Sequence, residues 1–172
     1  VRDLSAHPEA PEIEETGATF SENAALKAVG ISRVVPGLVL ADDSGLEVDA
    51  LGGAPGVHSA RYAGTHGDDT ANNAKLVEAL DGLPEEQRGG RFRCVLVLAE
   101  AGEVLAEVEG SVEGHLIGKP RGAEGFGYDP LFVPKGFAET FAELGAEVKN
   151  KLSHRARALE ALVAWLERDG GA

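Results

Sequence analysis

Two long β-forming runs separated by a two-residue turn are the feature that most limits the fold of this 172-residue chain. The segments RFRCVLVLAE (91–100) and EVLAEVEGSVEGHLI (103–117) are rich in Val and Leu, and they flank Ala101-Gly102. Short turns of this kind join antiparallel strands, so the pattern predicts a long β-hairpin. Any fold for the chain must build a sheet around this hairpin.

Helical patterns lie on both sides of the hairpin. Ser21 is a good N-cap for a helix over about 22–34, and the segment 68–81 combines an acidic first turn with apolar residues at helical spacing. Ser153 begins a third helix, which carries an apolar stripe and ends at Gly170-Gly171. The acidic segment before Ser21 is expected to be irregular.

Strands are expected at Leu38–Ala41 and around PLFVP (130–134), in addition to the hairpin. Because this order is not a plain βαβ alternation, the sequence predicts a mixed α/β fold with a mixed rather than an all-parallel sheet. A chain of 172 residues holds one sizeable core, so we expect a single domain over 1–172.

The net charge of −13 argues against nucleic acid as a partner, because phosphate backbones favour a basic surface. No apolar run approaches the roughly 20 residues of a membrane span. Cys94 is the single cysteine, so no intrachain disulfide is possible and a cytoplasmic location is the default expectation. The same charge makes an anionic substrate costly unless basic residues or a divalent cation gather near it.

Two adjacent carboxylates, Asp42 and Asp43, follow the apolar run 38–41 and precede Ser44-Gly45. Side chains alternate along a strand, so the two acids should point to opposite faces unless the backbone bends sharply. One of them could then serve as a Mg²⁺ ligand or a general base. The alternative, that both simply cap a turn, is equally compatible with this stretch alone.

A Mg²⁺ site uses one or two carboxylates together with substrate phosphates, so a second acid is needed. Glu14, Glu15 and Glu47 are the candidates, although each taken singly is more typical of a solvated surface acid. Lys27 lies in an otherwise apolar helical stretch, where it is either a surface residue or a phosphate ligand.

The segment KNKLSHRAR (149–157) holds a quarter of all Lys and Arg residues and surrounds the expected helix start at Ser153. Cations are unfavourable at a helix N-terminus, whereas a bound phosphate would reverse that cost. The pattern therefore favours an anion-binding site over a merely charged surface turn.

The segment GFGYDP (125–130) concentrates aromatic residues between glycines. Gly125 and Gly127 allow close backbone approach, Phe126 or Tyr128 can stack on a flat group, and Asp129 can accept hydrogen bonds from ring N–H groups. A purine base would fit these demands, and a tight turn before a strand is the alternative. Motifs of P-loop, dinucleotide-binding, zinc and serine-hydrolase proteins are not present, and DDSG lacks the Asp-x-Asp spacing of haloacid dehalogenase phosphatases.

Taken in order, the motifs EETG, FSENAALKA, LADDSGLEVDALGGAPGVHSARYAG, GFGYDPLF and KNKLSHRARAL resemble the inosine triphosphate pyrophosphatase family. The resemblance runs from about Glu14 to Arg157. It implies an elongated mixed α/β fold with two lobes around a cleft, and usually a homodimer. It also implies Mg²⁺-dependent cleavage of non-canonical purine nucleoside triphosphates such as ITP, dITP and XTP to the monophosphate and pyrophosphate.

The resemblance also assigns roles to residues. Asp43 is similar to the metal-linked general base and Glu15 to the second metal-linked carboxylate. The substrate-binding positions match Lys27 and Lys149 for the phosphates, Ser44 for a further substrate contact, Phe126, Gly127, Tyr128 and Asp129 for the base pocket, and His154 and Arg155 for the pair that closes over the nucleotide.

Members of this family begin with a strand and a TGNxGK-like phosphate loop, and this sequence contains no such segment. The expectation is therefore a domain without that strand and loop. Two functions remain open at this point: the pyrophosphatase, and a nucleotide-binding module that retains the base pocket without turnover.

Overall fold

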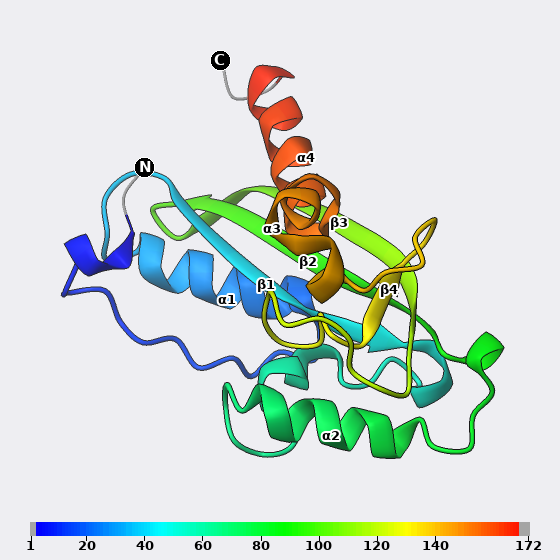
Figure 1. Cartoon of the computed structure of the whole chain (residues 1–172). Helices are drawn as coiled ribbons and strands as arrows, with labels where there is room; N and C mark the ends of the chain where they lie inside the picture. Colours follow the sequence, from blue (N-terminus) through cyan, green and yellow to red (C-terminus); the bar gives the residue numbers. More distant parts are fainter. Residues whose placement is uncertain (1–2, 169–172) are drawn as a thin grey trace.

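The computed structural model describes residues 3–168 and shows a four-stranded sheet with helices on both faces (Figure 1). The strands follow the chain in space, in the order β1-β2-β3-β4, and every pairing is antiparallel. The mixed α/β class is thus confirmed, while within the described residues the sheet is antiparallel rather than mixed in strand direction. The helices and strands are α1 (Phe20–Ser32), β1 (Val39–Val48), α2 (Asp69–Ala79), β2 (Gly89–Glu100), β3 (Glu103–Leu116), β4 (Phe132–Pro134), α3 (Phe141–Leu152) and α4 (His154–Arg168).

The predicted hairpin is confirmed by β2 and β3, which pair along nearly their whole length. Alternation along β2 gives the sheet two apolar faces. Val95 and Val97 pack under α1, whereas Cys94 and Leu96 pack under α4. The hairpin therefore positions the two helices on opposite faces of the sheet.

The buried apolar residues form two main clusters, which give the molecule two lobes. One lies between α1 and the sheet around Val95 and Val97, and the other joins α2, α3 and β4 around residues such as Leu76 and Phe132. In Figure 1, α2 lies at one end of the molecule and the C-terminal part of α4 extends away from the other, which gives an elongated outline. Within residues 3–168, no helix is both long and apolar enough to cross a membrane.

Strand β1 is longer than the sequence predicted. It continues through Asp42, Asp43 and Ser44 to Val48, without a sharp bend at Ser44-Gly45. The apolar start is also less buried than expected, because alternation leaves Leu40 45% exposed while Val39 is buried. The acids therefore lie in the middle of a strand and not at its end.

Two helical details differ from the predictions. Thr19 caps α1 by accepting a hydrogen bond from the Glu22 N–H at 3.1 Å, whereas Ser21 instead donates to Glu107 of β3. Helix α3 was not expected. It begins with a capping box between Thr140 and Glu143.

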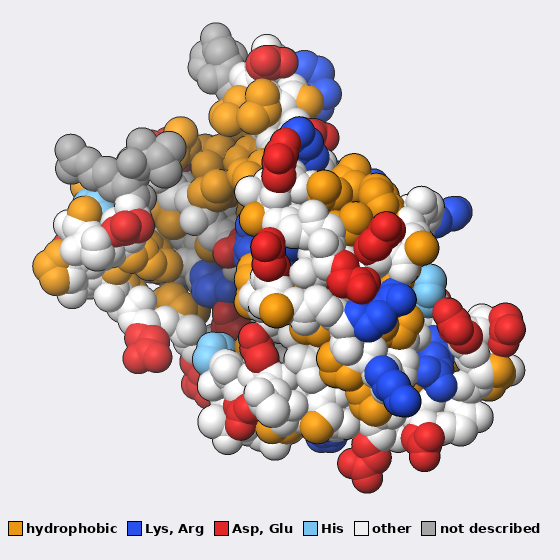
Figure 2. All heavy atoms as spheres, viewed as in Figure 1, with side chains coloured by type: hydrophobic (Ala, Val, Ile, Leu, Met, Phe, Trp, Pro, Cys, Tyr) orange, Lys and Arg blue, Asp and Glu red, His pale blue; other side chains and the backbone are white. Residues whose placement is uncertain are grey.

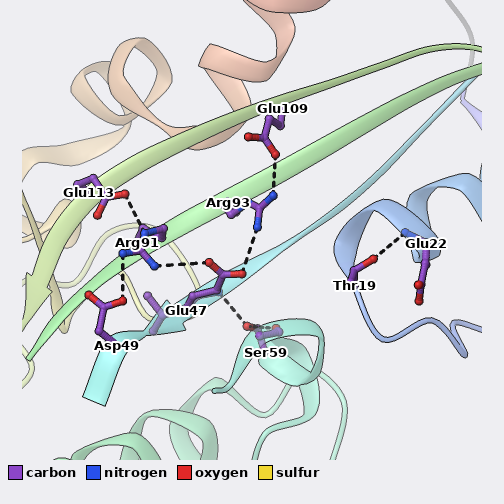
Figure 3. A network of polar contacts seen from close by, with 11 residues as sticks. Thr19, Glu22, Glu47, Asp49, Ser59, Arg91, Arg93, Glu109 and Glu113 are labelled. Carbon is purple, nitrogen blue, oxygen red and sulfur yellow. Dashed lines mark hydrogen bonds and ion pairs between the residues drawn. The ribbon is translucent and has the colours of Figure 1, made fainter. Parts of the chain in front are cut away.

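A ladder of ion pairs covers part of the α1 face of the sheet (Figure 3). Arg91 binds Glu113 at 2.8 Å, Asp49 at 3.0 Å and Glu47 at 3.7 Å. Arg93 binds Glu47 at 3.5 Å and Glu109 at 2.6 Å. Glu47 thus lies between two arginines.

Candidate functional site

The candidate site begins with the acids of β1, which point to opposite faces as alternation predicts. Asp43 faces α1, where Asn23 donates a hydrogen bond to its Oδ2 at 3.0 Å and the Lys27 ammonium lies 3.9 Å from its Oδ1. Lys27 also binds Glu15 at 2.5 Å. The structure therefore brings Glu15, Lys27 and Asp43 together from three separate segments.

Burial raises the pKa of Asp43, and the hydrogen bond from Asn23 and the charge of Lys27 oppose that rise. The Asp43 side chain is only 11% exposed. A carboxylate with a raised pKa in a half-closed site binds a proton more readily than a surface acid, which is the property that a general base needs.

Among the three candidates for a second metal-linked acid, Glu15 alone lies beside Asp43. Glu47 is held by Arg91 and Arg93, and Glu14 is exposed. Residues 3–168 contain no cluster of three acidic, His or Cys side chains that could hold a metal by themselves. The pair of Glu15 and Asp43 nevertheless fits Mg²⁺, because this ion usually binds one or two carboxylates and takes its remaining ligands from water and substrate phosphates.

An aromatic slot of about 200 Å³ lies on the other face of β1, between Ser44 and the segment that follows Gly125. Phe126, which is 63% exposed, forms one wall, and Tyr128 is buried with its hydroxyl donating to the Ser59 carbonyl at 2.7 Å. Asp129 is 1% exposed and accepts a hydrogen bond from the Phe126 N–H at 2.9 Å. The predicted base-pocket residues therefore meet in one concave site.

Lys149 borders the slot instead of joining Lys27. Its ammonium binds the buried Asp129 carboxylate and lies 3.9 Å from the centre of the Phe126 ring. A second hollow of about 430 Å³ opens on the other side of Phe126 and Lys149, along α3 and the start of α4. In the view of Figure 2, the molecular surface has a recess between the N-terminal part of the chain and the α3–α4 region, and both basic and acidic side chains lie in it.

His154 and Arg155 approach the slot from the first turn of α4. The His154 ring stacks on Phe92 with 5.0 Å between ring centres, and burial, together with Arg155 and Lys149, lowers its pKa to about 3. Arg155 binds Asp42 at 2.7 Å and lies 3.4 Å from the Ser44 hydroxyl. Asp42, the first acid of the adjacent pair, thus holds a predicted substrate-binding arginine.

The basic segment 149–157 does not converge on one anion site. Lys149 binds Asp129, Lys151 binds Glu147, Arg155 binds Asp42, and Arg157 donates to the Ser111 carbonyl. The physical reason is that Ser153 ends α3 in an extended conformation before α4 begins, so the flanking side chains diverge. Ser153 does cap α4, because its hydroxyl accepts the Ala156 N–H at 3.2 Å.

The model of the Ham1 family matches residues 1–165. The chain belongs to the Ham1 family. This confirms the family resemblance that the sequence motifs indicated.

Several relatives of the chain are named after an activity. A protein of Bacillus licheniformis called dITP/XTP pyrophosphatase is 54% identical over 158 residues, which cover 92% of this chain and 81% of that protein. The dITP/XTP pyrophosphatase of Geobacillus kaustophilus is 53% identical over 172 residues, covering 99% of this chain and 84% of that protein. The solved structure of the Staphylococcus aureus Ham1 protein superposes with a TM-score of 0.89 at 41% identity, covering 95% of this chain and 84% of that chain.

Sequence reasoning missed several residues of this Ham1-family site. Asn23 holds Asp43, and its own Oδ1 accepts the Gly17 N–H at 2.8 Å. Asn23 precedes Lys27 by four residues on the same helix, so the spacing alone placed both on one face. Asp69 and Asn73 of α2 contact Gly127, and no local pattern linked that helix with the aromatic segment.

Proposed function

We propose that this protein hydrolyses non-canonical purine nucleoside triphosphates, such as ITP, dITP and XTP, to the monophosphate and pyrophosphate. The observation that carries the proposal is the placement of Asp43 and Ser44 on β1. Asp43 belongs to the Glu15–Lys27 group and Ser44 lines the aromatic slot, and the Ser44 N–H donates to Asp43 at 3.0 Å. In this proposal the phosphates bind beside Asp43 and the base binds beside Ser44, one residue apart on β1.

Glu15 and Asp43 would hold Mg²⁺ in this proposal. When bound, the ion would neutralise the triphosphate charge and polarise the phosphate that is attacked. Such compensation is needed because a protein of net charge −13 repels a polyanion. Lys27 supplies a further positive charge beside the two acids.

Asp43 would orient a water molecule for in-line attack on the α-phosphorus and accept its proton. The new P–O bond forms at the α-phosphorus, and the bond to the oxygen that bridges the α- and β-phosphates breaks. Pyrophosphate leaves with that oxygen. The buried position of Asp43 suits this role, because a base works best when its pKa lies nearer to the working pH.

Selection for inosine or xanthine over adenine would rest on donors around the slot. Lys149 is fixed there between Asp129 and the Phe126 ring, so its ammonium can donate to a 6-oxo group. The 6-amino group of adenine would offer no acceptor to that donor, and an unpaired buried donor costs about 1–3 kcal/mol.

We also propose that the protein acts in the cytoplasm as a homodimer. Size-exclusion chromatography with light scattering would test the dimer.

The deciding experiment measures pyrophosphate release from dITP, XTP, ITP and dATP by the purified chain, with Mg²⁺ and again with excess EDTA. We expect release from the 6-oxo substrates, little from dATP, and none with EDTA. Binding of dITP without release at high protein concentration would instead identify a nucleotide-binding module. Release that persists in EDTA would contradict the assigned role of Glu15 and Asp43 in holding Mg²⁺.

A further inference from the structure

The aromatic slot depends on a loop that core packing alone does not hold. Phe126 is 63% exposed, and Gly125 and Gly127 on either side of it have φ angles of +81° and +59°. Such backbone has little intrinsic preference for one conformation. The Phe126 ring is therefore held by hydrogen bonds to the loop together with the Lys149 ammonium that lies over it.

One side of this loop is fixed by residues already assigned to the slot. Asp129 accepts the Phe126 N–H and binds Lys149. The other side is fixed by α2, a helix outside the predicted site. The Gly127 N–H donates to Asp69 Oδ2 at 2.7 Å, and the Gly127 carbonyl accepts from Asn73 Nδ2 at 2.8 Å.

Asn73 acts in this contact as a hydrogen-bond donor. Its Nδ2 donates to the Gly127 carbonyl and also to the Asp69 carbonyl at 2.7 Å. Its Oδ1 is buried without a hydrogen-bond partner in the part of the chain that the structure describes. Because the amide nitrogen of Asn73 donates two hydrogen bonds while its oxygen accepts none, the fold uses this side chain as a donor.

Helix α2 is a firm support for these contacts. Leu76 and Leu80 are fully buried in the core cluster of this lobe. Asn72 accepts from the Ala63 N–H at 2.7 Å and donates to the Ala60 carbonyl at 3.2 Å. Asp69 also lines the slot together with Phe126, so the helix start and the slot wall form one unit.

We propose that Asp69 and Asn73 are positioning residues that clamp the Gly127 peptide and so set the width of the purine slot. This inference rests on the proposed function, because it assigns the slot to the base. The clamp predicts that its loss weakens binding of the base-bearing product and leaves binding of pyrophosphate unchanged. Neither residue needs to contact the reacting phosphates.

The test compares the variants Asn73→Asp and Asp69→Ala with the unmodified protein by their inhibition constants for dIMP and for pyrophosphate, and by kcat and KM for dITP. Asn73→Asp replaces both donated hydrogens with an acceptor that faces two carbonyl oxygens. We expect it to weaken dIMP binding by about tenfold or more, the effect of losing one to two hydrogen bonds. Asp69→Ala removes the acceptor for the Gly127 N–H and should also weaken dIMP binding.

Asp68→Ala is the matched control. Asp68 caps α2 by accepting the Ala71 N–H at 3.0 Å, so its loss destabilises the same helix without touching Gly127. We expect a lower unfolding midpoint with unchanged dIMP binding. The inference is overturned if Asp68→Ala weakens dIMP binding as much as Asn73→Asp, if dIMP and pyrophosphate binding fall together, or if the clamp variants bind dIMP normally.

The proposed function can fail separately. A protein that hydrolyses dITP and has unaffected clamp variants overturns the clamp alone. A protein that neither hydrolyses dITP nor binds dIMP overturns both.

Discussion

At the scale of single residues, the proposed function depends most on the difference between the environments of Asp42 and Asp43. The two acids are adjacent in sequence and yet have different environments. Asp43 is nearly enclosed between β1 and α1, whereas Asp42 forms a half-exposed ion pair with Arg155 on the other face. The same side-chain chemistry therefore supports two roles.

Replacing Asp43 by Asn should lower kcat for dITP by at least about 10²-fold, because the amide cannot accept the proton of the attacking water. The unfolding free energy should stay equal or rise, since the variant removes a carboxylate whose charge is disfavoured by burial. Steady-state kinetics and urea unfolding measure the two effects.

The neighbouring variant Asp42→Asn is the natural comparison. It should mainly raise KM, by no more than about fivefold, because a half-exposed ion pair contributes about 1 kcal/mol or less. Equal losses of kcat in the two variants would contradict the separate roles.

At the scale of elements, local signals explain which parts of the fold the sequence predicted. Helix α2 was predicted because the segment 68–81 has an acidic first turn and apolar residues at helical spacing, and the hairpin because Ala101-Gly102 interrupts two apolar runs. Helix α3 was missed even though Thr140 and Glu143 have the spacing of a capping box. Gly145, which leaves helical geometry inside α3, interrupts the pattern that would have identified it.

The ladder around Glu47 allows a prediction for the sheet. Arg91→Met and Arg93→Met alone should each cost about 1 kcal/mol or less of unfolding free energy, because Glu47 keeps one arginine in either variant. The double variant leaves the Glu47 side chain, which is 21% exposed, without a cation. It should therefore cost about 1 kcal/mol more than the sum of the single effects.

Urea unfolding of the four proteins in a double-mutant cycle measures this coupling. The coupling free energy should be smaller in high salt, since ions screen the exposed acids of the ladder. Additive effects within about 0.3 kcal/mol would show that Glu47 does not link the two arginines.

At the scale of the whole molecule, the stacked pair of His154 and Phe92 makes the unfolding free energy depend on pH. His154 stacks on Phe92, and burial, with the charges of Arg155 and Lys149, holds its pKa at about 3 instead of 6.5, although Asp42 acts in the opposite direction. Between these values the unfolded chain binds a proton that the folded protein does not. Stability present above pH 6.5 is thus lost as the pH falls towards 3.

The variant His154→Phe keeps an aromatic ring against Phe92 and removes the titration. We expect its unfolding free energy to fall less steeply between pH 6.5 and 4, by up to about 1.4 kcal/mol per pH unit. Chemical denaturation across this range gives both slopes. Identical slopes would exclude His154 as a source of the acid sensitivity.

The candidate site shows how far sequence alone can reach. Residue chemistry left several acids open as candidates, and only the family resemblance singled out Glu15 and Asp43, which the structure places close together. The motifs could not place Lys149 beside Phe126 or connect α2 with Gly127, because those contacts arise from tertiary packing between segments far apart in the chain. The sequence thus indicated which chemical groups the site contains, whereas tertiary packing determines which of them are in contact.

The antiparallel pairing of β1 with β2 sets Asp43 opposite Val95 and Asp42 opposite Leu96. A slip of one position would exchange the faces of every side chain on the strand. Asp42 would then turn towards α1 and Lys27, and Asp43 towards Arg155, although no residue had changed. If Asp43 is the general base, as proposed, the choice between the two acids depends on how β1 and β2 align, and a misaligned β1 would keep the same sequence but place the wrong acid beside Lys27.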